Sequence, residues 1–377
     1  MRPEIRKKIL VSLTLVCSPI LLLLLHFRNT RKSENPRILV IPQLTRIGDL
    51  ISVTPIFREI KRKFPHAYVA VLVSKKNMGV VIENPHIDEI IHYQSIRLFA
   101  VLRAIYQGHF DISINAGATS EGTAISLWGQ IPERIKLTYS GRPLFEVLTD
   151  WMNTHSMRYT HQTYLPSFFL QLLHPLGIKA ENTDPEVFVT HRGRKVRDNF
   201  LVEKGIQGGK YIGISITAGN KIKEWGDDRF KELIKKILNR FPYYIFLIGG
   251  AGDRERIMSF RERFSREEAE RIVPVCGIPL EILSAFFEKL SLFIAVDTGL
   301  IHMAHALDVP LIDILGPVDS EELSPKSRKS RLLLPLNTRP SVFAFKRPGS
   351  AEDARRALSS ISVDQVESAC EDLLSEN

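Results

Sequence analysis

Short apolar runs alternate with longer amphipathic stretches along most of the chain. In the first half the apolar runs predict strands at residues 37–41, 68–73, 89–92 and 110–115, with helices between them. The pattern restarts near residue 210 and predicts further strands at residues 210–216, 243–248, 272–275, 292–296 and 311–315. Strands that alternate with helices indicate parallel sheets covered on both faces. The simplest fold is therefore α/β, with two doubly wound Rossmann-like halves joined within residues 175–208.

A chain of 377 residues suits two domains of ordinary size. We expect an N-terminal segment of residues 1–36 and two α/β domains, of residues 37–200 and 201–377. Doubly wound sheets bind ligands at the carboxyl ends of their strands, and two facing halves create a cleft.

An uncharged apolar run covers Ile9 to Leu25. As a helix it would span about 26 Å, just short of a hydrocarbon core of roughly 30 Å. A signal anchor, a cleaved signal peptide and a buried core helix all fit such a run. No small-x-small cleavage site follows it, which favours the anchor. Four basic residues lie on each side, so the charges do not decide the orientation.

The net charge of +9 is concentrated at this end of the chain. Residues 1–37 contain eight basic and two acidic residues and carry +6, so the other 340 carry only +3. Basic flanks of an apolar run are typical of a membrane surface, and a nucleic-acid partner is not expected. The 44% hydrophobic and 25% charged fractions exclude a disordered chain, and three cysteines exclude a disulfide framework.

The first candidate site is Thr45-Arg46-Ile47-Gly48-Asp49, between a predicted strand and a predicted helix. Gly48 permits a tight turn, and Asp49 falls in the first helical turn, where the helix dipole favours an anion. Asp49 is then either a residue that stabilises the start of the helix or a general base held over the cleft.

The second candidate site is Asp297-Thr298-Gly299, with His302 one turn later. Amide groups and a hydroxyl at a helix start suit a phosphate. Taken singly, Asp297 fits a helix cap and His302 fits a core histidine. His305 lies on the same helical face as His302, but no Cys or carboxylate at ligand spacing joins them, so zinc is not expected.

Two further loops follow predicted strands of the second half. One begins at Thr217 and carries Lys221 and Lys223, which suit either a phosphate or a solvated basic turn. The other, Gly249 to Glu255, fails the dinucleotide fingerprint because Glu255 stands at the third glycine. No two aspartates are spaced two apart, so an Asp-x-Asp metal site is not expected, and helix termini with a lysine would stabilise a diphosphate instead.

Together these motifs resemble the heptosyltransferase-type glycosyltransferases, family 9, which have the GT-B fold. The resemblance runs in order along residues 38–375 and is carried by RIGDLISVTPIFREIKRKFP, KEW with DRF, LIGGAGDRE, and VDTGLIHMAHALDVPLIDILGPVDS. The VDTGL string is closer to the lipopolysaccharide heptosyltransferase I type than to the NDTGP version of many relatives.

The resemblance implies an inverting, metal-independent enzyme without a cofactor. It would transfer a heptose or similar sugar from an ADP-sugar substrate to a lipopolysaccharide core or other lipid-linked glycan. By position, it implies that Asp49 is the general base, with Arg46 and Gly48 in the loop near the acceptor. Lys223 would act in catalysis by meeting the donor phosphates. The other implied donor-binding residues are Thr217, Asp253, Glu255, Asp297, Thr298, Gly299 and His302.

The apolar N-terminal run departs from the family, whose members typically lack an evident anchor. A lipid-linked acceptor is confined to a membrane, and ADP-sugars are made in the cytosol. We therefore expect a single pass through the inner membrane by residues 9–25, with the catalytic domains on the cytoplasmic face. The alternative is a membrane-anchored nucleotide-binding or assembly protein of the same fold without transfer activity. A dinucleotide-dependent oxidoreductase is disfavoured by the broken glycine fingerprint.

Overall fold

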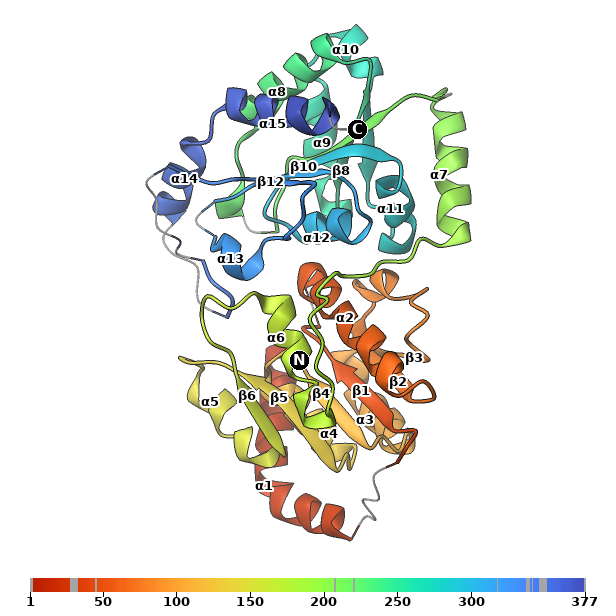
Figure 1. Ribbon diagram of the computed structural model, residues 1–377, viewed down its shortest axis with the longest axis vertical. Coiled ribbons are helices and arrows are strands. Elements are labelled where there is room, and N and C mark those ends of the chain that lie inside the picture. Colours follow the sequence, from red (N-terminus) through yellow and green to blue (C-terminus); the bar gives the residue numbers. More distant parts are fainter. Residues whose placement is uncertain are drawn as a thin grey trace. The chain divides into compact units, whose positions relative to one another are not determined.

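The computed structural model describes residues 3–27, 33–44, 46–206, 208–219, 221–316, 318–336, 340, 342–345 and 351–375. The chain forms two units, unit 1 (Met1–Pro185) and unit 2 (Glu186–Asn377). Each unit is an α/β domain built on one six-stranded sheet (Figure 1). The expected fold class, a GT-B type α/β chain with two doubly wound units and an apolar N-terminal helix, is confirmed.

The sheet of unit 1 is parallel and has the strand order β3-β2-β1-β4-β5-β6. Its strands are β1 (Arg37–Ile41), β2 (Tyr68–Ser74), β3 (Glu89–Tyr93), β4 (Ile112–Asn115), β5 (Glu133–Thr138) and β6 (His155–Arg158). The strands β1 and β2 are runs of buried branched side chains, as a sheet covered on both faces requires. The order reverses between β1 and β4, the position where doubly wound sheets bind ligands.

Helices cover both faces of this sheet. They are α2 (Ile47–Lys63), η1 (Met78–Val80), η2 (Ser95–Arg97), α3 (Leu98–Gln107), α4 (Ser120–Trp128), α5 (Leu144–Val147), η3 (Asp150–Met152), α6 (Leu165–Gln171) and η4 (His174–Leu176). Five residues separate the end of β1 from the start of α2, so the first turn of α2 lies at the carboxyl edge of the sheet.

The apolar N-terminal run forms α1 (Pro3–His26), which packs against α4 of unit 1. Among the described helices it is the one that is long and apolar enough to cross a membrane, with a mean hydropathy of 2.4 over its most apolar part. Leu10, Val11, Leu21 and Leu25 are buried against unit 1, whereas its opposite side is exposed. The helix thus combines the packing of a core helix with an exposed apolar face.

Unit 2 repeats the topology of unit 1, with the parallel strand order β12-β11-β10-β7-β8-β9. Its strands are β7 (Tyr211–Ser215), β8 (Tyr244–Gly249), β9 (Ile272–Cys276), β10 (Leu290–Val296), β11 (Leu311–Ile314) and β12 (Ser330–Leu333). The order reverses between β7 and β10, which makes the carboxyl ends of these two strands the expected ligand position.

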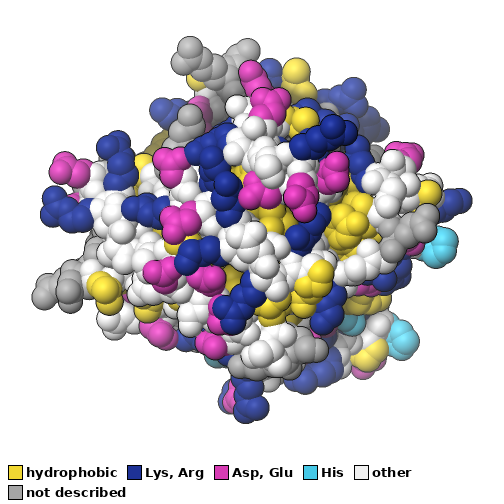
Figure 2. Space-filling model, turned by 90° about the horizontal axis from the view of Figure 1, so that it is seen from above, with side chains coloured by type: hydrophobic (Ala, Val, Ile, Leu, Met, Phe, Trp, Pro, Cys, Tyr) yellow, Lys and Arg dark blue, Asp and Glu magenta, His cyan; other side chains and the backbone are white. Residues whose placement is uncertain are grey.

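The helices of unit 2 are α7 (His191–Glu203), η5 (Lys221–Lys223), α8 (Asp227–Arg240), η6 (Ala251–Asp253), α9 (Arg254–Arg261), α10 (Arg266–Glu270), α11 (Leu280–Phe287), α12 (Gly299–Ala306), α13 (Ser320–Leu323), α14 (Ala351–Ser359) and α15 (Val363–Ser375). Ion pairs join α8 to α15, among them Lys236 with Glu367 at 2.7 Å. Figure 2 shows one face of the molecule, on which basic and acidic side chains lie next to each other and hydrophobic side chains form small groups.

Three strands, β5, β6 and β12, are not among those predicted from the sequence, and the predicted helix over 254–268 divides into α9 and α10. The chain divides into its two units between Pro185 and Glu186. Within unit 2, α7 packs on α11, where Arg197 donates to the carbonyl of Ala285 at 2.9 Å. Within unit 1, α1 packs on α4.

Candidate functional site

The site residues predicted in unit 2 lie where the strand order reverses. Thr217 follows the end of β7, and Asp297 follows the end of β10, and these two strands are neighbours in the sheet. Because parallel strands end at the same edge, the loops after β7 and β10 share that edge. The topology therefore brings two motifs together that are about eighty residues apart in the sequence.

Lys223 and Asp297 form an ion pair across this edge. The ammonium group of Lys223, at the end of η5, donates to the Asp297 carboxylate, and the two side chains are only 21% and 15% exposed. Such a pair is screened less than one on the surface. It fixes the direction of the lysine side chain. Lys221 of the same motif has a side chain outside the described residues.

Thr298 caps the helix α12. Its backbone is extended, and its hydroxyl oxygen accepts a hydrogen bond from the amide of Leu300 at 3.3 Å. Thr298 is therefore partly a structural residue, as its N-cap position requires. Gly299 begins α12, so the positive end of the helix dipole lies beside Asp297 and Lys223.

His302 lies one turn into α12 and is half-buried. Desolvation lowers the pKa of His302 to about 4, with the charge of Asp297 opposing this shift and the positive charges of His305 and Lys223 adding to it. The ring is therefore neutral at pH 7. A neutral imidazole offers one hydrogen-bond donor and one acceptor to a ligand at this edge.

Asp313 is a site residue that the sequence analysis did not single out. It lies on β11 beside Ala295 of β10, is fully buried, and neither carboxylate oxygen has a hydrogen-bond partner among the described residues. Burial raises the pKa of Asp313 well above its usual range, and the charge of Asp297 raises it further while Lys223 opposes. A single acidic residue in the apolar run LIDIL was the signal that marked it.

The loop after β8 lies one strand further from the reversal point. Asp253 accepts a hydrogen bond from the amide of Gly250 at 2.8 Å, so its carboxylate holds the loop together, whereas Glu255 is exposed in the first turn of α9. A side chain at Gly249 would meet Ile257 at 2.5 Å, which explains a glycine there.

Buried contacts hold the segment that carries Lys223. Trp225 is 1% exposed and donates through Nε1 to the carbonyl of Ile361 at 2.9 Å, while its ring packs edge-on against Phe230. On the other side, Arg256 of α9 donates to Glu224 at 2.8 Å and to Asp227 at 2.6 Å. The residues next to Lys223 therefore position it by packing and ion pairing.

Unit 1 holds the other predicted residues at its own reversal point. Asp49 is in the first turn of α2 and its side chain is 24% exposed, with Arg46 at 3.8 Å. Gly48 is half-buried in the same turn. Thr45 lies outside the described residues. The loop after β4 comes close to this one, since a side chain at Gly117 would meet the carbonyl oxygen of Pro42 at 2.9 Å.

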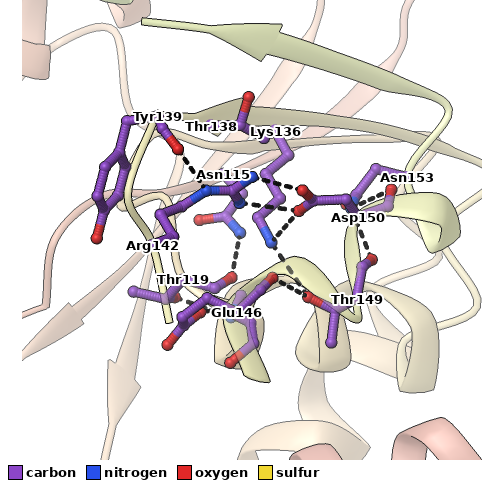
Figure 3. A network of polar contacts seen from close by, with 12 residues as sticks. Asn115, Thr119, Lys136, Thr138, Tyr139, Arg142, Glu146, Thr149, Asp150 and Asn153 are labelled. Carbon is purple, nitrogen blue, oxygen red and sulfur yellow. Dashed lines mark hydrogen bonds and ion pairs between the residues drawn. The ribbon is translucent and has the colours of Figure 1, made fainter. Parts of the chain in front are cut away.

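A network of charged residues at the carboxyl end of β5 was also missed (Figure 3). Lys136 is fully buried and pairs with Asp150 at 3.0 Å, and Arg142 donates to both carboxylate oxygens of Asp150 at 3.0 and 2.6 Å. Burial lowers the pKa of Lys136 although Asp150 opposes this. Burial alone would raise the pKa of Asp150, but Arg142 and Lys136 lower it on balance.

The network continues to the start of α4 and to α1. Glu146 accepts a hydrogen bond from Lys7 at 3.1 Å and another from the amide of Ser120. Burial would raise the pKa of Glu146, but Lys7 and the Ser120 amide lower it on balance. Burial raises the pKa of Tyr139, and the charge of Glu146 adds to this shift. The amino-terminal end of α1 is therefore linked to this network through Lys7.

Among the described residues, no group of three or more His, Cys, Asp or Glu side chains is arranged to hold a metal ion. At the position in unit 2 where the strand order reverses, the ionic groups are Lys223, Asp297 and Asp313. At the corresponding position in unit 1 they include Asp49 and Arg46.

Residues 98–348 match the model of glycosyltransferase family 9 (heptosyltransferase). A curated relative, lipopolysaccharide heptosyltransferase 3 of Escherichia coli K12, is 23% identical over 283 residues, which are 72% of this chain and 80% of the relative. The sequence string at Asp297 had favoured the heptosyltransferase I type, whereas this relative is a heptosyltransferase 3.

Solved structures of this family have the same fold. A family 9 glycosyl transferase from Veillonella parvula superposes with a TM-score of 0.78 at 22% identity, covering 93% of this chain and all of that one. The Escherichia coli heptosyltransferase WaaC with ADP superposes with a TM-score of 0.67 at 17% identity, covering 89% of this chain and 99% of that one.

Proposed function

The chain belongs to glycosyltransferase family 9, the heptosyltransferases, and from this premise we propose that it transfers a heptose from an ADP-sugar to a lipopolysaccharide-core acceptor. The transfer is inverting and metal-independent and uses no cofactor. The observation that carries the proposal is the ion pair of Lys223 and Asp297 beside the start of α12, at the reversal point of the sheet in unit 2.

This part of unit 2 has the chemistry that a nucleoside diphosphate needs. A helix start with a neighbouring ammonium group attracts a diphosphate, and Lys223 is directed to that position by Asp297. Thr217, Thr298, Gly299 and His302 surround the same edge, and the neutral ring of His302 adds a hydrogen bond without adding charge. The ADP in the WaaC structure supports an ADP-sugar as the donor. Asp253 and Glu255 are proposed to lie near the nucleoside.

Asp49 of unit 1 is proposed as the general base, with Arg46 and Gly48 next to the acceptor. Asp49 accepts the proton of an acceptor hydroxyl, and the hydroxyl oxygen bonds to the anomeric carbon opposite the leaving group. The bond from that carbon to the phosphate oxygen breaks, and its electrons leave with ADP. Lys223 and the amides at the start of α12 stabilise the charge that develops on the diphosphate.

The acceptor is proposed to be a lipid-linked glycan at the cytoplasmic face of the inner membrane. Attachment through residues 9–25 would raise the effective concentration of such an acceptor. The single-pass placement of this segment stays a prediction. No nucleic-acid partner is proposed.

The test is transfer by the purified full chain. ADP-heptose would be supplied with lipopolysaccharide extracted from cells that lack this protein, and ADP release and the mass of the glycolipid would be followed. We expect ADP release that depends on the extract and a glycolipid heavier by one sugar. Binding of ADP-heptose without any turnover would instead support a nucleotide-binding protein of the same fold without transfer activity.

A further inference from the structure

The helix α1 has two different apolar faces. Val11, Thr14 and Ser18 lie on a side that is almost completely buried against unit 1. The opposite side follows a helical repeat and is exposed, with Val16 at 78%, and Phe27 directly after the helix is 77% exposed. The other members of this exposed stripe are Ile5, Ile9, Leu13, Ile20, Leu23 and Leu24. A helix that was simply part of the core would not carry such a stripe.

Specific contacts fix which face of α1 meets unit 1. The indole of Trp128 donates to the hydroxyl of Thr14 at 2.9 Å, and that hydroxyl donates to the carbonyl of Leu10 at 2.7 Å. Near the start of the helix, Lys7 pairs with Glu146 at 3.1 Å. If α1 left unit 1 to cross a bilayer alone, these partners would separate, and the apolar residues of α4 and η3 beneath it would be exposed.

Exposed hydrophobic side chains continue on both sides of α1. On one side Ile96 and Phe99, at 74% and 83% exposed, precede Tyr106 on α3. An open groove of about 1310 Å³ separates α1 from this helix, and most of its lining is apolar. On the other side lie α5 and η3, in and between which Leu144, Val147, Leu148 and Trp151 are exposed. An apolar surface shared by several elements marks an interaction site.

The charged residues at this surface are mainly basic. Arg6 and Arg103 line the groove, Lys8 and Arg97 are exposed beside it, and Glu4 is the one acidic residue in residues 3–27 and 95–110. The acidic residues of α5 and η3, Glu146 and Asp150, are paired with Lys7 and Arg142. Anionic lipid headgroups attract such residues, while the apolar side chains between them suit the acyl region. Tyr106 and Trp151 have the amphipathic rings that favour a membrane interface. The pattern fits a bilayer better than a protein partner.

We propose that α1 lies in the plane of an anionic lipid bilayer while it stays packed on unit 1. The exposed stripe of α1, together with α3 on one side and α5 with η3 on the other, forms the membrane-binding surface. This arrangement differs from the single-pass placement predicted from the sequence, because both ends of α1 stay on the same side of the membrane.

The arrangement also bears on the acceptor, and this step rests on the proposed function. The Lys7–Glu146 pair ties the start of α1 to the polar network after β5, in which Figure 3 shows Glu146, and this network belongs to the same unit as Asp49. A unit held at the bilayer through α1 would meet a lipid-linked sugar that stays in the bilayer.

Vesicle binding tests the surface without any transfer assay. The full chain would be floated with vesicles of phosphatidylcholine alone or mixed with phosphatidylglycerol. Phe99→Gln should weaken binding roughly tenfold, because it removes one large apolar side chain from the membrane. Val202→Gln, at a site on unit 2 that is 71% exposed, is the matched control and should leave vesicle binding unchanged. Both sites are exposed, so neither variant should change thermal unfolding.

Three results would contradict the proposed membrane-binding surface. Phe99→Gln and Val202→Gln could bind vesicles equally well, the anionic lipid could make no difference, or the wild-type chain could form a dimer that hides Phe99 and ignores vesicles. A chain that binds vesicles as described but transfers no sugar would leave this inference intact and remove the proposed function.

Labelling the two ends of α1 distinguishes a helix in the plane from one that spans. Cysteines at position 4 (Glu4→Cys) and position 33 (Ser33→Cys) would be placed separately in a Cys17→Ser chain in sealed membrane vesicles, and a membrane-impermeant maleimide would be added outside. We expect both positions to react in vesicles of one orientation and neither in the other. Reaction of the two positions from opposite sides would show a spanning helix and contradict the proposal.

Discussion

Lys223 and Asp297 form an ion pair that joins the loop after β7 to the loop after β10. The pair connects two motifs of the chain and directs the lysine toward the start of α12. Because Asp297 already holds the ammonium group, an arriving diphosphate would find the lysine oriented and would compete with Asp297 for it. Under the proposed function, the ion pair keeps Lys223 oriented for the donor diphosphate.

Lys223→Ala should reduce transfer by roughly 10²–10³, because it removes a charged donor from the leaving diphosphate. The loss should appear in kcat and in the affinity for ADP, both measured with the purified chain. Lys235→Ala is the control, since Lys235 lies on α8 and is 45% exposed. Equal activity of the two variants would exclude Lys223 from the donor site.

Asp313→Asn should stabilise the fold at alkaline pH. Burial in the folded state raises the pKa of Asp313, so the unfolded chain loses this proton at a lower pH than the folded chain does. The free energy of unfolding therefore falls as the pH rises above the usual aspartate range. Asparagine has the same shape and no proton to lose. Urea unfolding should show a gain of about 1–3 kcal/mol at pH 8 and a smaller difference at pH 4. A gain that is the same at both pH values would mean that Asp313 does not titrate differently in the two states.

His302 should give a pH dependence of the opposite sign. Its pKa is about 4 in the folded chain and near 6.5 when unfolded, so the unfolded chain binds the extra proton between these values. The free energy of unfolding should therefore fall as the pH drops from 6.5 to 4, by roughly 2 kcal/mol. Denaturant unfolding of the wild-type chain and of His302→Asn at several pH values in this range measures the contribution of His302. If the two free energies of unfolding changed in parallel with pH, the predicted pKa shift of His302 would be contradicted.

In the buried network of unit 1, loss of Asp150 should lower the free energy of unfolding more than loss of Lys136. Asp150→Ala leaves Lys136 buried without its counter-charge and should cost about 3–5 kcal/mol. Lys136→Met leaves Asp150 paired with Arg142 and should cost about 1 kcal/mol. Denaturant unfolding of both variants measures this. A larger loss for Lys136→Met would mean that the lysine supports the fold by packing and not through its charge.

The sequence predicted the strands that are continuous apolar runs, such as β1 and β10, and the turns that follow them. It did not predict β5, because Arg134 and Lys136 interrupt the apolar pattern. Partners from later in the chain make their burial possible: Arg134 donates to the carbonyl of Met152 at 2.8 Å, besides the nearby carbonyl of Ile131, and Lys136 pairs with Asp150. Long-range partners of this kind leave no local signal.

The same limit applies to the site. The motif containing Lys223 and the motif containing Asp297 were each visible, but their pairing depends on β7 and β10 being neighbours in the sheet. Asp313 escaped notice because its importance comes from burial beside that pair. The docking of α1 depends on the contact of Thr14 with Trp128, two residues that are unremarkable in the sequence.

The most direct test of the account is the turnover of ADP-heptose by Asp49→Asn, measured at saturating donor and acceptor together with the affinity for ADP-heptose. A positioned base contributes about 10²–10⁴ in rate, so we predict a loss of this size with the donor affinity within a few-fold of the wild-type value. Turnover equal to that of the wild-type chain, or a parallel loss of donor binding, would contradict the role of Asp49 as the base in heptosyl transfer.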